Sequence, residues 1–551
     1  MLASPLARSS AARDRQKAET PIPEYNITLV VNYQAASFTG TEVVAFTNTA
    51  RESIDAVIFN LYPNLGQEDE NKPRLTVSRV RFRERDLAFS LQSRGVVLKV
   101  ALPGKLATGE RAELAIDFAA VIPRVAAEET SLLAHFLEEI NDAIGDERAD
   151  SAAREIFFAT DEAVLLGYFF PLLASNVSQD LDRLPAAGVK SAICAEIANY
   201  RVRVSVENGI TVVGSGEVVD RSVARGEGLG GRQLVEFRAA NLRSFALVLG
   251  EHLKPMERKT SATTITGFFQ PGSEKVGQRI LELAARAVDV FSRAFGPYSG
   301  PTLKVVELPL PASFSGIDLP GMVVLAHAYF VDFDSPQPHL PSIVRSQADV
   351  IKSALEFTLA HEIAHQWWGG IVGSDPQRSP FLDESLAQFS AVYLYESIEG
   401  VELAETVIEQ QVRGTYFTYR MFGGSDIEVE RPLRDLRSRL QYAAITQAKG
   451  AFFLLEMRRQ MGDEKFFAAL RDYINENRYT ISSPEKLKSA LLAASSDPRL
   501  LRASMRRWLE EKHADEDIGN PTTTLLPQGN TGMRKLGRLF VWIGRAAARP
   551  F

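Results

Sequence analysis

Residues 361–365 read His-Glu-Ile-Ala-His and lie inside the apolar stretch 351–368, IKSALEFTLAHEIAHQWW. Apolar residues recur at every fourth position of this stretch: Ile351, Leu355, Leu359 and Ile363. This period predicts a helix with one buried face. Spacing of i and i+4 puts His361 and His365 on the same side of that helix, where both imidazoles can bind one cation. The alternative is a pair of solvated histidines on an amphipathic helix.

Glu362 lies beside the two histidines, where a carboxylate can take a proton from a metal-bound water. A catalytic zinc ion keeps three protein ligands and one open position, so a third ligand is needed. Glu384 is the candidate, because Ser379-Pro380 predicts the start of a second helix just before it. A second helix that folds back would bring this carboxylate to the histidine pair. The sequence therefore predicts one zinc ion per chain, bound by His361, His365 and Glu384.

The pattern HExxH followed eighteen residues later by Glu resembles the M1 peptidases, the zinc aminopeptidase family among the gluzincins. Four neighbouring segments resemble the same family: 295–298 (FGPY), 365–369 (HQWWG), 449–451 (KGA) and 461–467 (MGDEKFF). The likeness extends over roughly residues 25–517, and the zinc signature is its most specific part.

This resemblance implies an α+β fold, with a β-rich N-terminal domain followed by a mainly helical, thermolysin-like catalytic domain. The residue pattern agrees, because β-branched and aromatic runs dominate the first half and helical signals dominate after about residue 255. We expect four parts: a flexible segment 1–24, the β-rich domain 25–255, the peptidase domain 256–517, and a linker with a basic amphipathic tail at 518–551. Within the β-rich part, Asn208-Gly209 favours a type I′ hairpin between strands on either side of it.

Two departures from the family pattern concern the substrate and the transition state. The family segment GxMEN, whose Glu holds the free α-amine of the substrate, corresponds best to 315–321 (SGIDLPG), so Gly316 and Asp318 are the expected substrate-binding residues. The tyrosine of the family's YxKG segment, which donates to the oxyanion, falls on Gln447. Tyr442, five residues upstream, is the candidate substitute.

Composition excludes several other classes of protein. A formal net charge of −7 and a pI near 5.7 give no electrostatic support for nucleic-acid binding. The single cysteine, Cys194, rules out an internal disulfide framework. No apolar segment approaches the ~20 residues needed to span a bilayer, so we expect a cytoplasmic protein. The basic tail at 532–551 is either a peripheral membrane contact or a solvated tail.

We therefore predict a zinc metallopeptidase that acts on peptides, most simply an aminopeptidase that removes N-terminal residues. One alternative is a metallohydrolase with endopeptidase or non-peptide specificity. A second is a zinc-stabilised scaffold with weak catalysis, which Gln447 in place of tyrosine would favour. Glu362 argues against the scaffold, because a structural site needs the metal ligands and not the base. The sequence leaves the oligomeric state open.

Overall fold

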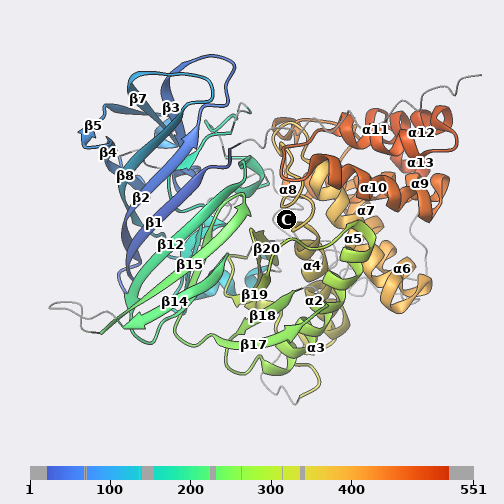
Figure 1. The fold of residues 1–551 in the computed structure, drawn as a ribbon. Helices are drawn as coiled ribbons and strands as arrows, with labels where there is room; N and C mark the ends of the chain where they lie inside the picture. The colour runs from blue at the N-terminus through green and yellow to red at the C-terminus, as the bar shows by residue number, and fades with distance from the viewer. Residues whose placement is uncertain are drawn as a thin grey trace, which may run out of the picture.

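The computed structural model describes residues 21–519, except for 68, 70, 136, 139–153, 176, 178, 183, 186, 224–230, 262, 313 and 336–341. The predicted N-terminal segment, apart from 21–24, and the basic tail lie outside these residues, as does most of the predicted linker. Figure 1 shows β-sheets on one side of the molecule and helices on the other. We call these parts the N-terminal β region (residues 24–250) and the C-terminal region (residues 254–517).

The N-terminal β region is built on a large sheet that has eight strands within the described residues. In spatial order the strands are β14 (Glu217–Val223), β15 (Arg232–Leu242), β12 (Ala198–Glu207), β1 (Glu24–Asn32), β2 (Ser37–Thr47), β8 (Arg111–Val121), β4 (Leu75–Phe82) and β5 (Arg85–Asp86). Exposed and buried residues alternate strictly along β1, so one face of the sheet covers the core and the other meets solvent.

Two smaller sheets complete the N-terminal β region, each with four strands in the part of the chain that the structure describes. One contains β13 (Thr211–Gly214), β16 (Ala246–Gly250), β10 (Ala163–Gly167) and β9 (Phe157–Ala159). The other contains β11 (Leu172–Leu173), β3 (Ile54–Asn60), β7 (Val97–Leu106) and β6 (Phe89–Gln92). The strands β10 and β16 are buried throughout, as expected of strands with a covered sheet face on both sides.

The predicted hairpin at Asn208-Gly209 is wrong. The strands on either side of this turn belong to different sheets: β12 pairs with β1 and β15, whereas β13 pairs with β16. A type I′ turn needs positive φ at both central residues. Gly209 has φ of 91°, but Asn208 is not among the residues with positive φ. The turn therefore carries the chain from one sheet to the next.

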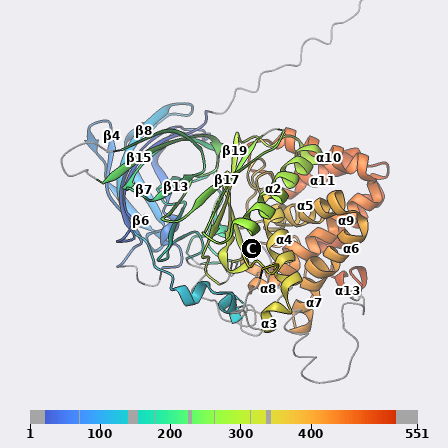
Figure 2. The same ribbon diagram turned by 90° about the horizontal axis from the view of Figure 1, so that it is seen from below.

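The C-terminal region begins with a sheet that the sequence analysis did not predict. Its order over the described residues is β17 (Lys254–Lys259), β18 (Thr264–Phe269), β19 (Thr302–Leu308), β21 (Met322–Ala326) and β20 (Gly316–Leu319). The central strands run parallel, and the edge strands β17 and β20 run antiparallel to their neighbours. Figures 1 and 2 show this sheet between the N-terminal β region and the helices.

Helices form the rest of the C-terminal region. They are α2 (Glu274–Phe295), α3 (Ser342–Arg345), α4 (Ala348–Ala364), α5 (Phe381–Glu399), α6 (Val401–Val407), α7 (Gly414–Met421), α8 (Arg439–Tyr442), α9 (Gly450–Met461), α10 (Asp463–Asn477), α11 (Pro484–Ala494), α12 (Pro498–Glu510) and α13 (Ala514–Asp517). Segments of π-helix join α6 to α7 (Ile408–Arg413) and α8 to α9 (Ala443–Lys449). The predicted α+β fold, β-rich and then largely helical, is confirmed. No helix in the described residues is long and apolar enough to cross a bilayer.

Helices α2 and α4 pack on the sheet formed by β17, β18, β19, β21 and β20, which we call the small sheet. Helix α2 packs on β17 and β18, and α4 packs on β20 and β21. Helix α5 packs in turn on α4 and α9. The end of α4, the start of α5 and strand β20 therefore meet in one place, deep in the C-terminal region.

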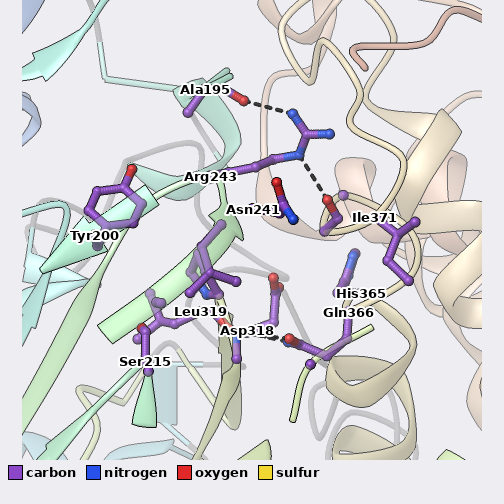
Figure 3. A pocket seen from close by; sticks show the side chains of 18 of the residues that line it. Ala195, Tyr200, Ser215, Asn241, Arg243, Asp318, Leu319, His365, Gln366 and Ile371 are labelled. Carbon is purple, nitrogen blue, oxygen red and sulfur yellow. Dashed lines mark hydrogen bonds between the residues drawn. The ribbon is translucent and has the colours of Figure 1, made fainter. Parts of the chain in front are cut away.

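Arg243, directly after β15, joins the N-terminal β region to the C-terminal region. Its guanidinium donates to three backbone carbonyls, those of Ala195 (2.9 Å), Gly370 (3.0 Å) and Thr480 (3.0 Å). A glycine is required opposite it, because a Cβ at Gly373 would lie 2.4 Å from the Arg243 Cζ atom. Figure 3 shows two of these hydrogen bonds at the edge of the cavity described below.

We expect Arg243→Met to lower the free energy of unfolding by about 2–4 kcal/mol, because it leaves buried carbonyls without their charged donor. Thermal and urea unfolding would measure the change. The matched control is Arg258→Met, which removes an ion pair with Glu282 from a side chain that is 51% exposed. Such surface pairs contribute about 0–1 kcal/mol. Equal stability of the two variants would show that Arg243 does not hold the regions together.

Candidate active site

Helix α4 presents the predicted histidine pair. Its apolar residues at every fourth position are buried as expected, and His361 and Glu362 are fully buried with them. His365 follows directly after the last residue of the helix. The Nε2 atoms of His361 and His365 lie 3.0 Å apart, so both rings face the same point.

Glu384 lies in the first turn of α5 and completes a three-residue cluster. Its Oε2 atom is 3.4 Å from His361 Nε2 and 3.8 Å from His365 Nε2. The ligand atoms of the three residues all lie within 4.8 Å of one another. Two imidazole nitrogens and one carboxylate oxygen form a donor set typical of catalytic zinc sites, so the residues present fit this metal.

The second nitrogen of each imidazole is held by a neighbour. His365 Nδ1 lies 3.0 Å from the carbonyl oxygen of Trp368, which can only accept, so Nδ1 carries the proton and Nε2 keeps its lone pair. His361 Nδ1 lies 2.9 Å from Gln388 Oε1. Burial lowers the pKa of His365 well below its usual value, which keeps the ring neutral. These contacts orient both histidines for metal binding.

Glu362 provides a carboxylate next to the cluster that does not belong to it. Neither of its oxygens has a hydrogen-bond partner among the described residues, although the side chain is fully buried. Burial raises the pKa of this carboxyl to about 7. Buried polar groups in native proteins are nearly always paired, so a carboxylate in this state indicates a functional role.

Asp318 lies on the edge strand β20, across the site from α4. Its carboxylate, that of Glu362 and a ring nitrogen of His365 lie within 4.8 Å of one another. Gln366 fixes the turn that follows, because its side chain donates to the Leu319 carbonyl (3.2 Å) and accepts from the Gly321 N–H (3.0 Å). The structure therefore brings Asp318 beside the histidine and carboxylate cluster.

Gly316 begins β20 at the point where the strand meets α4. A Cβ at this position would lie 2.4 Å from Thr358 Cγ2 and 3.2 Å from Glu362 Cγ. The absent side chain lets the strand approach the helix and the Glu362 side chain. Direct contact between Gly316 and substrate stays a prediction.

Tyr442 and Gln447 both lie against Glu384. The Tyr442 hydroxyl donates to Glu384 Oε1 (3.1 Å), and the Gln447 amide donates to Glu384 Oε2 (2.9 Å). Both side chains are buried, and Gln447 belongs to the π-helical segment Ala443–Lys449. Their role at the oxyanion stays a prediction. In the structure both side chains donate to Glu384, the candidate third metal ligand.

Lys190 enters the site from the N-terminal β region, and the sequence analysis missed it. It begins a short 3₁₀-helix, Lys190–Ala192, and its backbone N–H donates to the buried carboxylate of Glu155 (3.1 Å). Its ammonium is in direct ion-pair contact with the Asp318 carboxylate. Both side chains are mostly buried, with 18% and 16% of their surface exposed.

A cavity of about 790 Å³ is lined by several of these residues. The C-terminal region contributes Asp318, His365 and Glu384 to its lining, and the N-terminal β region contributes Lys190 and Tyr200 among others. Figure 3 shows Asp318 and His365 facing the cavity, with Tyr200 on the opposite side. A cavity of this size and mixed lining suits a small ligand or the end of a peptide.

Gln388, which contacts His361, was also not predicted, although the sequence contains a local indication of it. It follows Glu384 by one helical turn on α5, and this i, i+4 spacing could have identified it as a partner of the histidine pair. Lys190 and Arg243 have no such signal. Lys190 pairs with Asp318, and Arg243 donates to Gly370 and Thr480, all of them more than a hundred positions away.

Comparison with known proteins agrees with this geometry. The family model "Peptidase family M1 domain" matches residues 280–508. The chain is 24% identical to "Aminopeptidase 2, mitochondrial" from Saccharomyces cerevisiae over 295 residues. These aligned residues make up 52% of this chain and 28% of the yeast protein. Over 252 residues the chain is 23% identical to "Tricorn protease-interacting factor F2" from Thermoplasma acidophilum, which is 45% of this chain and 30% of that protein. The chain thus spans less than a third of these relatives.

The fold has a solved counterpart over nearly its whole length. The crystal structure of an M1 zinc metallopeptidase from Deinococcus radiodurans superposes with a TM-score of 0.62 and 17% sequence identity, covering 89% of this chain and 93% of that one. This likeness shows that the two proteins share a fold. Residues 280–508 are thus similar to the peptidase domain of family M1, and the chain shares its fold with an M1 zinc metallopeptidase.

Proposed function

We propose that this chain is a zinc-dependent metallopeptidase that removes N-terminal residues from peptides. The cluster of His361, His365 and Glu384, with the unpartnered Glu362 carboxylate beside it, is the observation that carries this proposal. The names of several relatives, all aminopeptidases, support it.

His361, His365 and Glu384 would hold the metal. A bound zinc ion supplies Lewis acidity, which polarises a carbonyl and makes water more acidic. The chain's own residues then provide the rest of the chemistry. Glu362 takes the proton of the attacking water and returns it to the nitrogen of the leaving amine, as a general base and then a general acid. Asp318 pairs with the α-amine of the substrate and so sets which bond is cleaved.

The test is a panel of fluorogenic aminoacyl amides, each with a free and an N-acetylated amine, assayed with the zinc-loaded protein. We expect hydrolysis of free-amine substrates, loss of that hydrolysis with a chelator, and recovery when zinc is restored. Activity that a chelator does not change would contradict a metal-dependent reaction. Faster cleavage of the acetylated substrates would contradict the removal of N-terminal residues.

We expect Tyr442→Phe to lower zinc affinity or kcat by about 10–100-fold, because groups that orient metal ligands typically have effects of this size. Competition with a chelator and steady-state kinetics would measure the two quantities. Tyr395→Phe is the matched control, because the Tyr395 hydroxyl is buried without a hydrogen-bond partner among the described residues. If both variants match the wild type, the bond from Tyr442 to Glu384 has no functional role.

A further inference from the structure

The ion pair between Lys190 and Asp318 occupies the place where the proposed function needs a free carboxylate. Asp318 is the group that would receive the α-amine of the substrate, and the Lys190 ammonium already contacts it. A substrate that pairs with Asp318 must therefore displace an internal cation. The consequence for the substrate depends on what Lys190 then finds as a partner.

A peptide with a neutral first residue would take the Asp318 carboxylate from Lys190 and supply none in return. More distant carboxylates, among them those of Glu155 and Glu362, would then still attract the ammonium. The Lys190 side chain is only 18% exposed, and breaking a largely buried ion pair is costly because the ammonium loses its direct partner. A peptide with a blocked amine would cover the intact pair with an uncharged group. Both charges would lose water and gain no new partner.

A peptide whose first residue is Asp or Glu avoids both costs. Its α-amine gives Asp318 a new cation, and its side-chain carboxylate gives Lys190 a new anion. One internal pair is exchanged for two pairs with the substrate, so Asp318 and Lys190 each keep a direct partner of opposite charge. Both groups line the cavity and come from different regions of the chain, Asp318 from β20 and Lys190 from the N-terminal β region, so each can contact a different group of the same substrate residue.

We propose that Lys190 is a specificity-determining residue that selects peptides with an acidic N-terminal residue. This inference rests on the proposed function and names the substrate class of the same site. Glu155 supports the position of Lys190, because its buried carboxylate accepts the Lys190 backbone N–H and fixes the start of the 3₁₀-helix. The side chain is then directed from a fixed backbone to the edge strand.

The experiment compares glutamyl and glutaminyl aminomethylcoumarin amides, which have similar shape and differ in charge. With the zinc-loaded wild type, we expect kcat/KM for the glutamyl substrate to exceed that for the glutaminyl one by at least about tenfold. In Lys190→Met this ratio should fall to about one, and kcat/KM for the glutaminyl substrate should rise because nothing competes for Asp318. Lys190→Arg should keep the preference. Lys254→Met, at an exposed position on β17, is the matched control and should behave as the wild type.

A wild-type ratio of one or less would overturn the inference, and so would an unchanged ratio in Lys190→Met. Cleavage of N-acetylglutamyl amide as fast as the free-amine form would also overturn it, because Asp318 would then not receive an amine. The first two outcomes leave the proposed function intact where free-amine substrates are hydrolysed, whereas the third also contradicts the proposed role of Asp318 in removing N-terminal residues. Failure to cleave any substrate in the panel would instead reject the proposed function, and the inference with it. The wild-type comparison needs no variant, so the test holds even if Lys190→Met does not fold.

Discussion

Glu362→Gln is expected to bind zinc as the wild type does and to lose about 10²–10⁴-fold in kcat, the range that a positioned general base contributes. Glutamine has nearly the same shape as glutamate but cannot accept a proton at neutral pH. Glu362 is outside the His361, His365 and Glu384 cluster, so its change leaves the metal ligands in place. Elemental analysis of the purified variant and steady-state kinetics on one free-amine substrate would measure both parts of the prediction.

Glu356→Gln is the control for this variant. Glu356 lies on the same helix, six residues earlier, and forms an ion pair with Arg279 on α2 away from the cavity. Its kcat should stay close to that of the wild type. Wild-type turnover in Glu362→Gln would show that another group takes the proton from water. Loss of zinc from this variant would show that Glu362 is a metal ligand.

The parts of the site that sequence could predict are those fixed by short-range geometry. A helix places residues i and i+4 on one face whatever surrounds it, so the facing of His361 and His365 follows from their spacing. Glu384 was predicted as the third ligand because Ser379-Pro380 indicates the start of a second helix, which can fold back onto the first. Helix α4 follows from apolar periodicity, and the start of α5 follows from the signal at Ser379-Pro380.

Long-range contacts carried no comparable signal. Lys190 and Arg243 come from the N-terminal β region, and each acts on residues that only the tertiary fold brings near. The small sheet from β17 to β20 was missed for a related reason. Its central strands are short and pair in parallel across long connections, so no hairpin pattern marks them.

Local signals also misled where the tertiary fold decided the outcome. Asn208-Gly209 is a strong hairpin signal. However, Val212 and Val213 are buried in β13, which pairs with β16 and not with β12, the strand before the turn. Burial of these side chains outweighs the preference of the dipeptide. The π-helical segment Ala443–Lys449 also could not be predicted, because no spacing of apolar residues distinguishes it from an α-helix. It determines how Gln447 meets Glu384, so the contacts of Tyr442 and Gln447 with that carboxylate could only come from the structure.

His365→Ala is expected to bind less than one zinc per chain and to lose measurable peptidase activity, because two ligands cannot hold a catalytic zinc ion firmly. The loss should also lower thermal stability in the presence of zinc, since a ligand that binds only the folded state stabilises it. The chain should still fold without metal. The side chains around the site are packed in a continuous apolar core, and the His365 contact with the Trp368 carbonyl is one of many that fix this segment.

Elemental analysis and thermal unfolding with and without added zinc would test this prediction, and His252→Ala would serve as its control. His252 is the same residue type with 66% of its side chain exposed, away from the metal cluster. The His252→Ala variant should bind one zinc ion per chain and unfold at the same temperature as the wild type. Zinc should raise the unfolding temperature of the wild type and of His252→Ala but not that of His365→Ala. An equal rise in all three proteins would place the metal at another site, and the assignment of His361, His365 and Glu384 as ligands would then be wrong.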